Sequence, residues 1–304
     1  MEKHFTRPKS FGEVLDLTFR ISKNNFSTFF VIMLIVVGPI ILIDALISLL
    51  AGSGFIRDIA GGGSFFDQLS NTIDESIYGT TTLAADLGVI VVGLATIVLY
   101  PIAQAAVIYA IEALRNQEEF TAGSVIKAAF SRFWPIFGSS LLFGVIVFGM
   151  IFVPVVIITM VTAVGAIVNP VMGIATFIIL FLALGSVVAY FLTRWSLYLP
   201  AVVFEPCAPG LGRSWNLTRK NFWRTFGLIV VIGAISIIIS VVFDLLFTAL
   251  LGYSVLYSIL INIITIITTM FFSVGYGLIY YDLKLRNDGD DLMEMIEDYE
   301  SPTE

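Results

Sequence analysis

The chain has 304 residues, of which 58% are hydrophobic and only 13% are charged, and its mean hydropathy is +0.97. Soluble domains carry about 25% charged residues, so this composition excludes an ordinary soluble protein and indicates an integral membrane protein. The formal net charge is -7, but much of the negative charge gathers in residues 288–304. We expect these residues to form an acidic, flexible cytoplasmic tail. Nucleic acid is not expected as a partner of an acidic tail and membrane-sited basic residues.

Six apolar segments, taken in chain order, are long enough to cross the hydrocarbon core of a bilayer, which requires about 20 helical residues. They are residues 26–50, 83–114, 137–168, 171–191, 226–251 and 255–279. Asn169-Pro170 and Gly252-Tyr253-Ser254 divide the two longest apolar regions into hairpins. The first segment begins too late and is too long for an ordinary cleaved signal peptide, so we expect it to remain as a span.

A short amphipathic helix is predicted before three of these segments. Ser10 and Glu13 have the spacing of a capping box, which predicts a helix that starts at Phe11. Similar helices are expected to begin at Thr121 and at Gly210. Each places apolar residues on one side and polar or basic residues on the other, a pattern typical of helices that lie in the membrane interface.

The sequence also repeats itself, since several residues recur at one displacement. Gly12, Phe26, Asp44 and Gly52 recur 200 residues later as Gly212, Phe226, Asp244 and Gly252, and Gly123 and Phe137 mark a middle copy in which Val155 replaces the aspartate. Two spans per copy give every copy the same orientation. We therefore predict an all-α membrane protein with six transmembrane helices in three parallel two-span repeats, each preceded by a cytoplasmic interfacial helix. The repeats cover about residues 10–116, 121–205 and 210–287 of a single domain (1–287), arranged as a six-helix bundle.

Basic residues predict the orientation of these spans. All 16 Lys and Arg residues except Arg57 fall on one side of the predicted membrane, and the positive-inside rule makes that side cytoplasmic. Both termini are then cytoplasmic, in a multi-pass protein of a bacterial cell membrane. The connection 51–82 is external and is expected to hold a further interfacial helix.

Three stretches carry a resemblance to a known family. They are Arg213-Ser214-Trp215-Asn216-Leu217-Thr218, the opening Ser10-Phe11-Gly12-Glu13-Val14-Leu15-Asp16 and the closing Tyr280-Tyr281-Asp282-Leu283-Lys284-Leu285-Arg286. Over essentially its whole length the chain resembles the membrane domain attached to some bacterial glycerophosphoryl diester phosphodiesterases, which also exists as stand-alone proteins. The resemblance implies that phosphodiesterase chemistry belongs to a separate soluble barrel with histidines and metal-binding carboxylates. With His4 as its single histidine, this chain is expected to be non-enzymatic and to need no metal or cofactor.

Three carboxylates are candidates for an intramembrane polar site. Asp44 and Asp244 lie 18 residues beyond Phe26 and Phe226, which places them toward the outer leaflet, and Asp86 starts the second span near the same level. Charges inside a span are costly, so they warrant a functional hypothesis: a cation, proton or amine-headgroup site open to the outside. The alternative is that each carboxylate reaches external water or caps a helix.

Two groups of residues are predicted on the cytoplasmic side. Arg194 and Glu205 flank the inner end of the fourth span and are expected to form a structural ion pair, which Glu112 could join. Basic residues of the interfacial helices could hold anionic lipid headgroups. These candidates are Arg20, Lys127, Arg213 and Lys220.

The favoured function is that of a non-enzymatic multi-pass membrane protein that binds, organises or moves lipid or another amphiphile, with membrane lipids as its partners. The alternative is a small-solute or ion permease that uses the outer carboxylates. A membrane-bound enzyme ranks last, because the sequence shows no nucleophile and base pair, no metal cluster and no phosphate loop.

Overall fold

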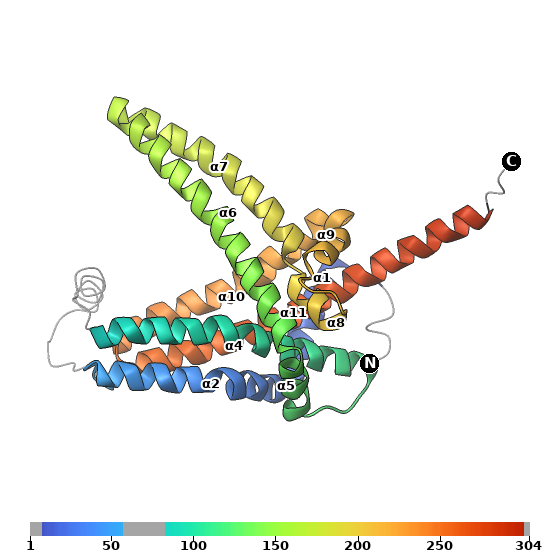
Figure 1. Ribbon diagram of the computed structural model, residues 1–304, viewed down its shortest axis with the longest axis horizontal. Coiled ribbons are helices and arrows are strands. Elements are labelled where there is room, and N and C mark those ends of the chain that lie inside the picture. Colours follow the sequence, from blue (N-terminus) through green and yellow to red (C-terminus); the bar gives the residue numbers. More distant parts are fainter. Residues whose placement is uncertain (1–7, 57–82, 301–304) are drawn as a thin grey trace.

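The computed structural model in Figure 1 describes residues 8–56 and 83–300, and of residues 83–85, 168 and 288–300 it describes the backbone alone. Within these residues the chain is helical and holds no strand. The helices are α1 (Phe11–Asn24), α2 (Phe26–Leu50), α4 (Leu83–Asn116), α5 (Ala122–Ser131), α6 (Phe133–Val168), α7 (Pro170–Trp195), α8 (Tyr198–Phe204), α9 (Leu211–Arg219), α10 (Phe222–Leu251) and α11 (Val255–Glu300). The helix predicted in the connection 51–82 lies outside the described residues, apart from 51–56.

Six of these helices, α2, α4, α6, α7, α10 and α11, are long and apolar enough to cross a membrane. The prediction of a multi-pass, all-helical membrane protein is therefore confirmed. α11 runs to Glu300, so the backbone of residues 288–300 is helical where we expected a flexible tail. This stretch has no proline, and its second half, from Leu292, holds two methionines and three glutamates, which favour helix.

The starts of α1, α5 and α9 lie where the sequence predicts them. The Ser10 hydroxyl accepts from the backbone N–H of Glu13, whose carboxylate accepts from the N–H of Ser10 at 2.7 Å. Thr121 and Ser124 form the same reciprocal capping pair before α5. Gly210 precedes α9 with a φ of 75°, a left-handed conformation that suits glycine.

Each short helix joins its long partner through a residue of the same non-helical conformation. The φ/ψ angles are −115°/21° at Asn25, −108°/30° at Arg132 and −123°/35° at Asn221. Arg132 and Asn221 fall five residues before Phe137 and Phe226, whereas Asn25 falls directly before Phe26. The sequence match therefore marks equivalent turns of α2 and α10 but not their equivalent starts, because α1 is longer than α9 by more than a turn.

The long helices pair as the hairpins α2/α4, α6/α7 and α10/α11. Figure 1 shows α2, α4, α10 and α11 lying side by side, while α6 and α7 leave this group at an angle. The predicted six-helix bundle is therefore wrong in part, since four of the six long helices pack side by side and the α6/α7 hairpin diverges from them. The outer part of the divergent hairpin exposes apolar side chains such as Ile167, which is 85% exposed. Lipid tails solvate such side chains as well as protein does, so nothing forces the hairpin closed.

The buried core lies near the end of the bundle where the short helices meet, and α8 is part of it. Leu199, Ala201 and Val202 of α8 are fully buried. The sequence predicts no helix between the fourth span and the helix that begins at Gly210. Because seven consecutive residues from Tyr198 to Phe204 include no charge, burying this segment stabilises the base through the hydrophobic effect.

Candidate functional site

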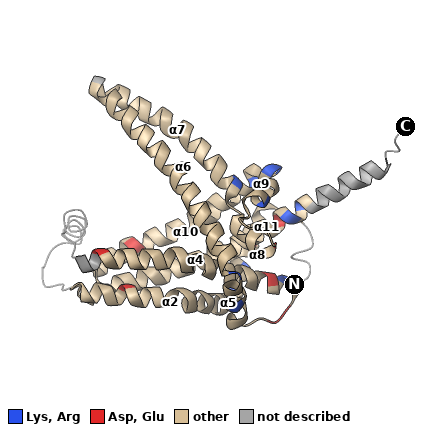
Figure 2. Ribbon diagram, in the orientation of Figure 1, with Lys and Arg blue, Asp and Glu red and all other residues tan. Residues whose placement is uncertain are grey.

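Charge is distributed unevenly along the bundle. Figure 2 shows lysine and arginine gathered around α1, α5, α9 and the adjoining ends of the long helices, while acidic residues mark the opposite ends of α2, α4 and α10. We call these the basic end and the acidic end. Among the described residues, no group of three or more histidine, cysteine, aspartate or glutamate side chains could hold a metal ion.

The three predicted carboxylates lie at the acidic end without forming one site. Asp44 accepts hydrogen bonds from the hydroxyl of Ser258 and from Nδ2 of Asn262 at 3.5 Å. Asp244 accepts from the hydroxyl of Tyr257 at 2.6 Å. All three donors belong to α11, so this helix separates Asp44 on α2 from Asp244 on α10.

Asp86 is exposed in the first turn of α4, where a carboxylate is favourable beside the unpaired N–H groups of the helix start. Asp44 and Asp244 thus bond to a neighbouring helix, and Asp86 lies exposed at a helix start. This arrangement is closer to the alternative given from the sequence, in which each carboxylate reaches water or caps a helix, than to a shared site.

At the basic end, Glu205 is the centre of one polar cluster. Its carboxylate accepts from Arg213 at 3.0 Å, from Lys284 Nζ at 3.0 Å and from the hydroxyl of Tyr280 at 2.9 Å. Arg132 donates to the backbone oxygen of Glu205 at 3.3 Å. Partial burial alone would raise the pKa of Glu205, but the three side-chain donors together hold that pKa below its usual value of 4.5.

The predicted pairing of Arg194 with Glu205 is wrong. The Arg194 guanidinium instead donates to the Tyr190 hydroxyl at 3.1 Å and stacks over the rings of Trp215 and Phe222, 5.0 and 5.7 Å from their centroids. Arg194 lies at the end of α7, facing α9 and α10, whereas Glu205 follows α8 and turns toward α11. Arg194 and Glu205 are close in sequence, but α8 lies between them in the chain and directs their side chains to different neighbours.

Glu112 also stays outside the cluster, because it forms no ion pair with any described residue.

Arg194 is 8% exposed, so its aromatic neighbours replace water around the cation.

A second cluster at the basic end was missed by the sequence reasoning. Asp282 accepts from Arg224 at 2.9 Å and from Arg286 at 3.1 Å, and it also accepts from the backbone N–H of Lys9 at 2.7 Å. Its side chain is only 2% exposed. The two arginines also donate to the backbone oxygen of Lys9, so this cluster ties the start of α10 and the segment before α1 to α11. The sequence signal that could have indicated this cluster is Asp282, an aspartate that directly follows Tyr280-Tyr281 at the end of an apolar segment.

The candidates for lipid-headgroup contact are not equivalent. Arg213 is committed to Glu205, so the structure does not support it as a free headgroup contact. Arg20 forms a loose, exposed ion pair with Asp16 at 3.8 Å. Lys127 and Lys220 are exposed. These three cations therefore keep at least part of their side chains in contact with the surroundings.

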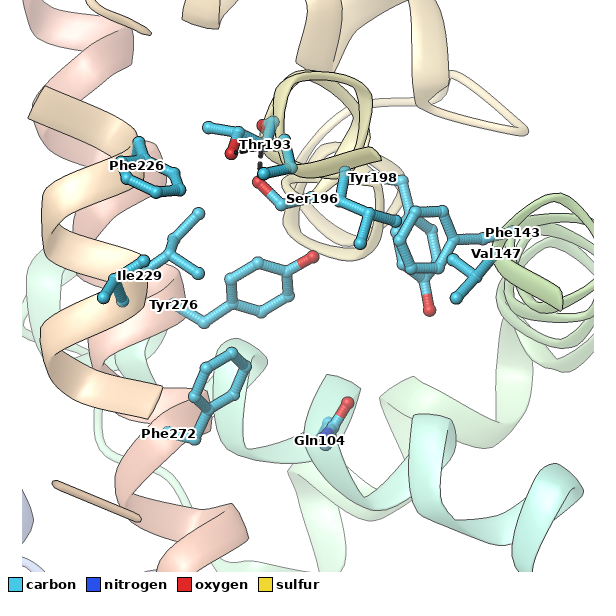
Figure 3. A pocket seen from close by; sticks show the side chains of 13 residues that line it. Gln104, Phe143, Val147, Thr193, Ser196, Tyr198, Phe226, Ile229, Phe272 and Tyr276 are labelled. Atoms are coloured by element: carbon cyan, nitrogen blue, oxygen red, sulfur yellow. Dashed lines mark hydrogen bonds between the residues drawn. The ribbon is translucent and has the colours of Figure 1, made fainter. Parts of the chain in front are cut away.

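A groove open to a ligand lies between the α6/α7 hairpin and the rest of the bundle. It has a volume of about 480 Å³ and is lined by residues of α4, α6, α7, α8, α10 and α11. Figure 3 shows Phe226, Ile229 and Phe272 on one wall and Phe143 with Tyr198 on the other. Val230 of the same groove is 47% exposed, so the groove opens sideways, toward the region a bilayer would fill.

The groove owes its position to the base of the hairpin. Tyr198 of α8 stacks on Phe143 of α6 with centroids 4.4 Å apart, and Tyr190 of α7 packs on Phe222 of α10 at 5.1 Å. These contacts hold the hairpin to the bundle at one end, and the divergence beyond them leaves the space. A groove of this size and lining has the character of a small-ligand site.

No family model, curated protein or solved structure matches this chain. The resemblance to the phosphodiesterase-associated membrane domain therefore stays a prediction.

Proposed function

We propose that this chain is a non-enzymatic multi-pass membrane protein that binds lipid or another amphiphile in the lateral groove between the α6/α7 hairpin and the bundle, and so organises or moves it. The groove carries this proposal. Its lining is mainly apolar and it opens sideways, so a hydrocarbon chain could enter from the bilayer without crossing water.

The proposed membrane placement sets the basic end at the cytoplasmic face of a bacterial cell membrane, with the N-terminus there. Basic residues around α1, α5 and α9 support this orientation. Trp134 and Trp223, each in the first turn of a long helix, are 75% and 79% exposed. Tryptophan favours the headgroup layer, so these rings fit a bilayer surface at the level of the junctions.

We further propose that the three hairpins with their short helices are parallel repeats and that α1, α5 and α9 lie in the interface. The shared backbone conformation at Asn25, Arg132 and Asn221 supports the repeats. Phe19 of α1 and Phe130 of α5 are 49% and 44% exposed, as expected of rings that face acyl chains. Membership of the resembled family is part of the same proposal.

The permease alternative has less support. A conduction or exchange site needs carboxylates that share a path, whereas Asp44 and Asp244 each bond to separate residues of α11. Unchanged cation flux into liposomes on replacing both with asparagine would exclude this alternative, and loss of a flux seen with the unmodified chain would revive it.

Native mass spectrometry of the detergent-purified chain tests the groove. We expect bound lipid to be retained by the unmodified protein and lost in Ile229→Trp, which fills the groove. Ile239→Trp is the matched control, because Ile239 lies on the same helix and outside the groove lining. Equal lipid retention by both variants would contradict the proposal.

A further inference from the structure

The polar atoms of the groove are all uncharged. None of the 13 residues that line it is aspartate, glutamate, lysine, arginine or histidine. The polar side chains are Gln104, Thr193, Ser196, Tyr198 and Tyr276. A charged headgroup inside the groove would therefore leave water without gaining an opposite charge, which is strongly unfavourable.

Several of these hydroxyls use their hydrogen within the protein. Thr193 donates to the backbone oxygen of Ala189 at 2.7 Å, Ser196 donates to that of Thr193 at 2.8 Å, and Tyr198 donates to Ser140 Oγ at 3.3 Å. A hydroxyl oxygen that has donated still has lone pairs to accept a hydrogen bond. This side of the groove can therefore receive a hydrogen from a ligand.

Gln104 faces these hydroxyls from α4. Figure 3 shows its amide directed into the groove. The side chain is half-buried and makes no hydrogen bond with the described residues. An amide without a partner in an apolar environment is costly. The amide offers two donor hydrogens and one acceptor oxygen, so a ligand group that both donates and accepts would satisfy it best.

We propose that the ligand of the groove is a lipid whose polar end is an uncharged hydroxyl, of the diacylglycerol class, and that Gln104 binds this hydroxyl. The proposal rests on the lipid-binding function proposed above and narrows it. A phospholipid that placed only an acyl chain in the groove would set methylene groups against the Gln104 amide, and one that placed its phosphate there would find no cation. A hydroxyl lipid avoids both costs.

Competitive photolabelling of the purified full-length chain tests this inference. The two probes are a photoreactive diacylglycerol and a photoreactive phosphatidylglycerol with the same acyl chains, and labelled peptides are identified by mass spectrometry. We expect diacylglycerol to label groove residues of α10 and α11 in preference to phosphatidylglycerol. In Gln104→Leu the diacylglycerol affinity should fall roughly tenfold, the worth of one hydrogen bond. Thr96→Val, a change on the same helix outside the groove lining, should leave it unchanged.

The outcomes separate the inference from the function on which it rests. Equal or stronger labelling of the groove by phosphatidylglycerol in the unmodified chain would overturn the hydroxyl-lipid inference and leave lipid binding standing. Preferential diacylglycerol labelling that Gln104→Leu does not weaken would remove Gln104 from the site and overturn the inference as stated. Groove peptides labelled by neither lipid, with label elsewhere unaffected by Ile229→Trp, would overturn both proposals.

Discussion

Replacing Asp282 with alanine should destabilise this protein more than any surface charge change. The carboxylate is 2% exposed, and its partners Arg224 and Arg286 are 20% and 27% exposed. Its removal leaves two largely buried guanidinium groups without their anion. Breaking a buried ion pair by deleting one partner costs about 3–5 kcal/mol, which for a chain of this size corresponds to a fall of roughly 5–10 °C in Tm.

The assay is thermal unfolding in one detergent, followed by tryptophan fluorescence. Asp16→Ala is the matched control, because Asp16 is 74% exposed and pairs with Arg20 only at 3.8 Å. A solvent-screened pair of this kind is worth at most about 0.5 kcal/mol, so the control should unfold within about 1 °C of the unmodified chain. Asp282→Asn, which keeps the shape but loses the charge, should fall between them. If Asp282→Ala and Asp16→Ala unfold at the same temperature, the cluster does not stabilise the fold as argued.

Three further predictions concern the basic end. The folded pKa of Glu205 is lowered, so its stabilising contribution is present above about pH 4.5 and is lost as pH falls through the folded value. Glu205→Gln should therefore reduce the fall in Tm as the pH is lowered through this range. An unchanged dependence of Tm on pH would contradict this. Gly210→Ala should destabilise the protein by about 1–3 kcal/mol, because φ is +75° and the new methyl would lie 2.5 Å from the Tyr198 carbonyl oxygen. Gly212→Ala, which meets nothing within 4 Å, should be close to neutral, and equal Tm shifts for the two would refute the reasoning. Burial, followed by the nearby Glu205 charge, raises the pKa of the Cys207 thiol above 9.0, so maleimide labelling at pH 7.5 should be slow until the chain is unfolded in SDS. Rapid labelling of the folded chain would show that the thiol is more reactive than its surroundings predict.

Local signals in the sequence identified the helices well. The capping residues Ser10 and Thr121 predict the starts of α1 and α5, because the bonds concerned join residues three positions apart. The six spans follow from unbroken apolar length, which requires no knowledge of neighbours.

The sequence reasoning failed wherever the answer depended on contacts between distant segments. Glu205 binds Lys284, 79 residues away, and Asp282 binds Lys9, 273 residues away. Periodicity and charge counts carry no information on such pairs. The groove is harder still to predict, because it is formed by the angle at which the α6/α7 hairpin leaves the bundle and by the stacking of Tyr198 on Phe143.

The two walls of the groove differ in how they are held. α10 and α11 are joined at both ends, by Arg224 with Asp282 at the basic end and by Asp244 with Tyr257 at the acidic end. Among the described residues, the side-chain hydrogen bonds from the α6/α7 hairpin to other helices all arise near the basic end, as with Ser140 and Tyr198. The α10/α11 wall is therefore held at both ends and the hairpin wall at its base, so Asp244, which accepts from Tyr257, stabilises the wall against which we propose that a lipid lies.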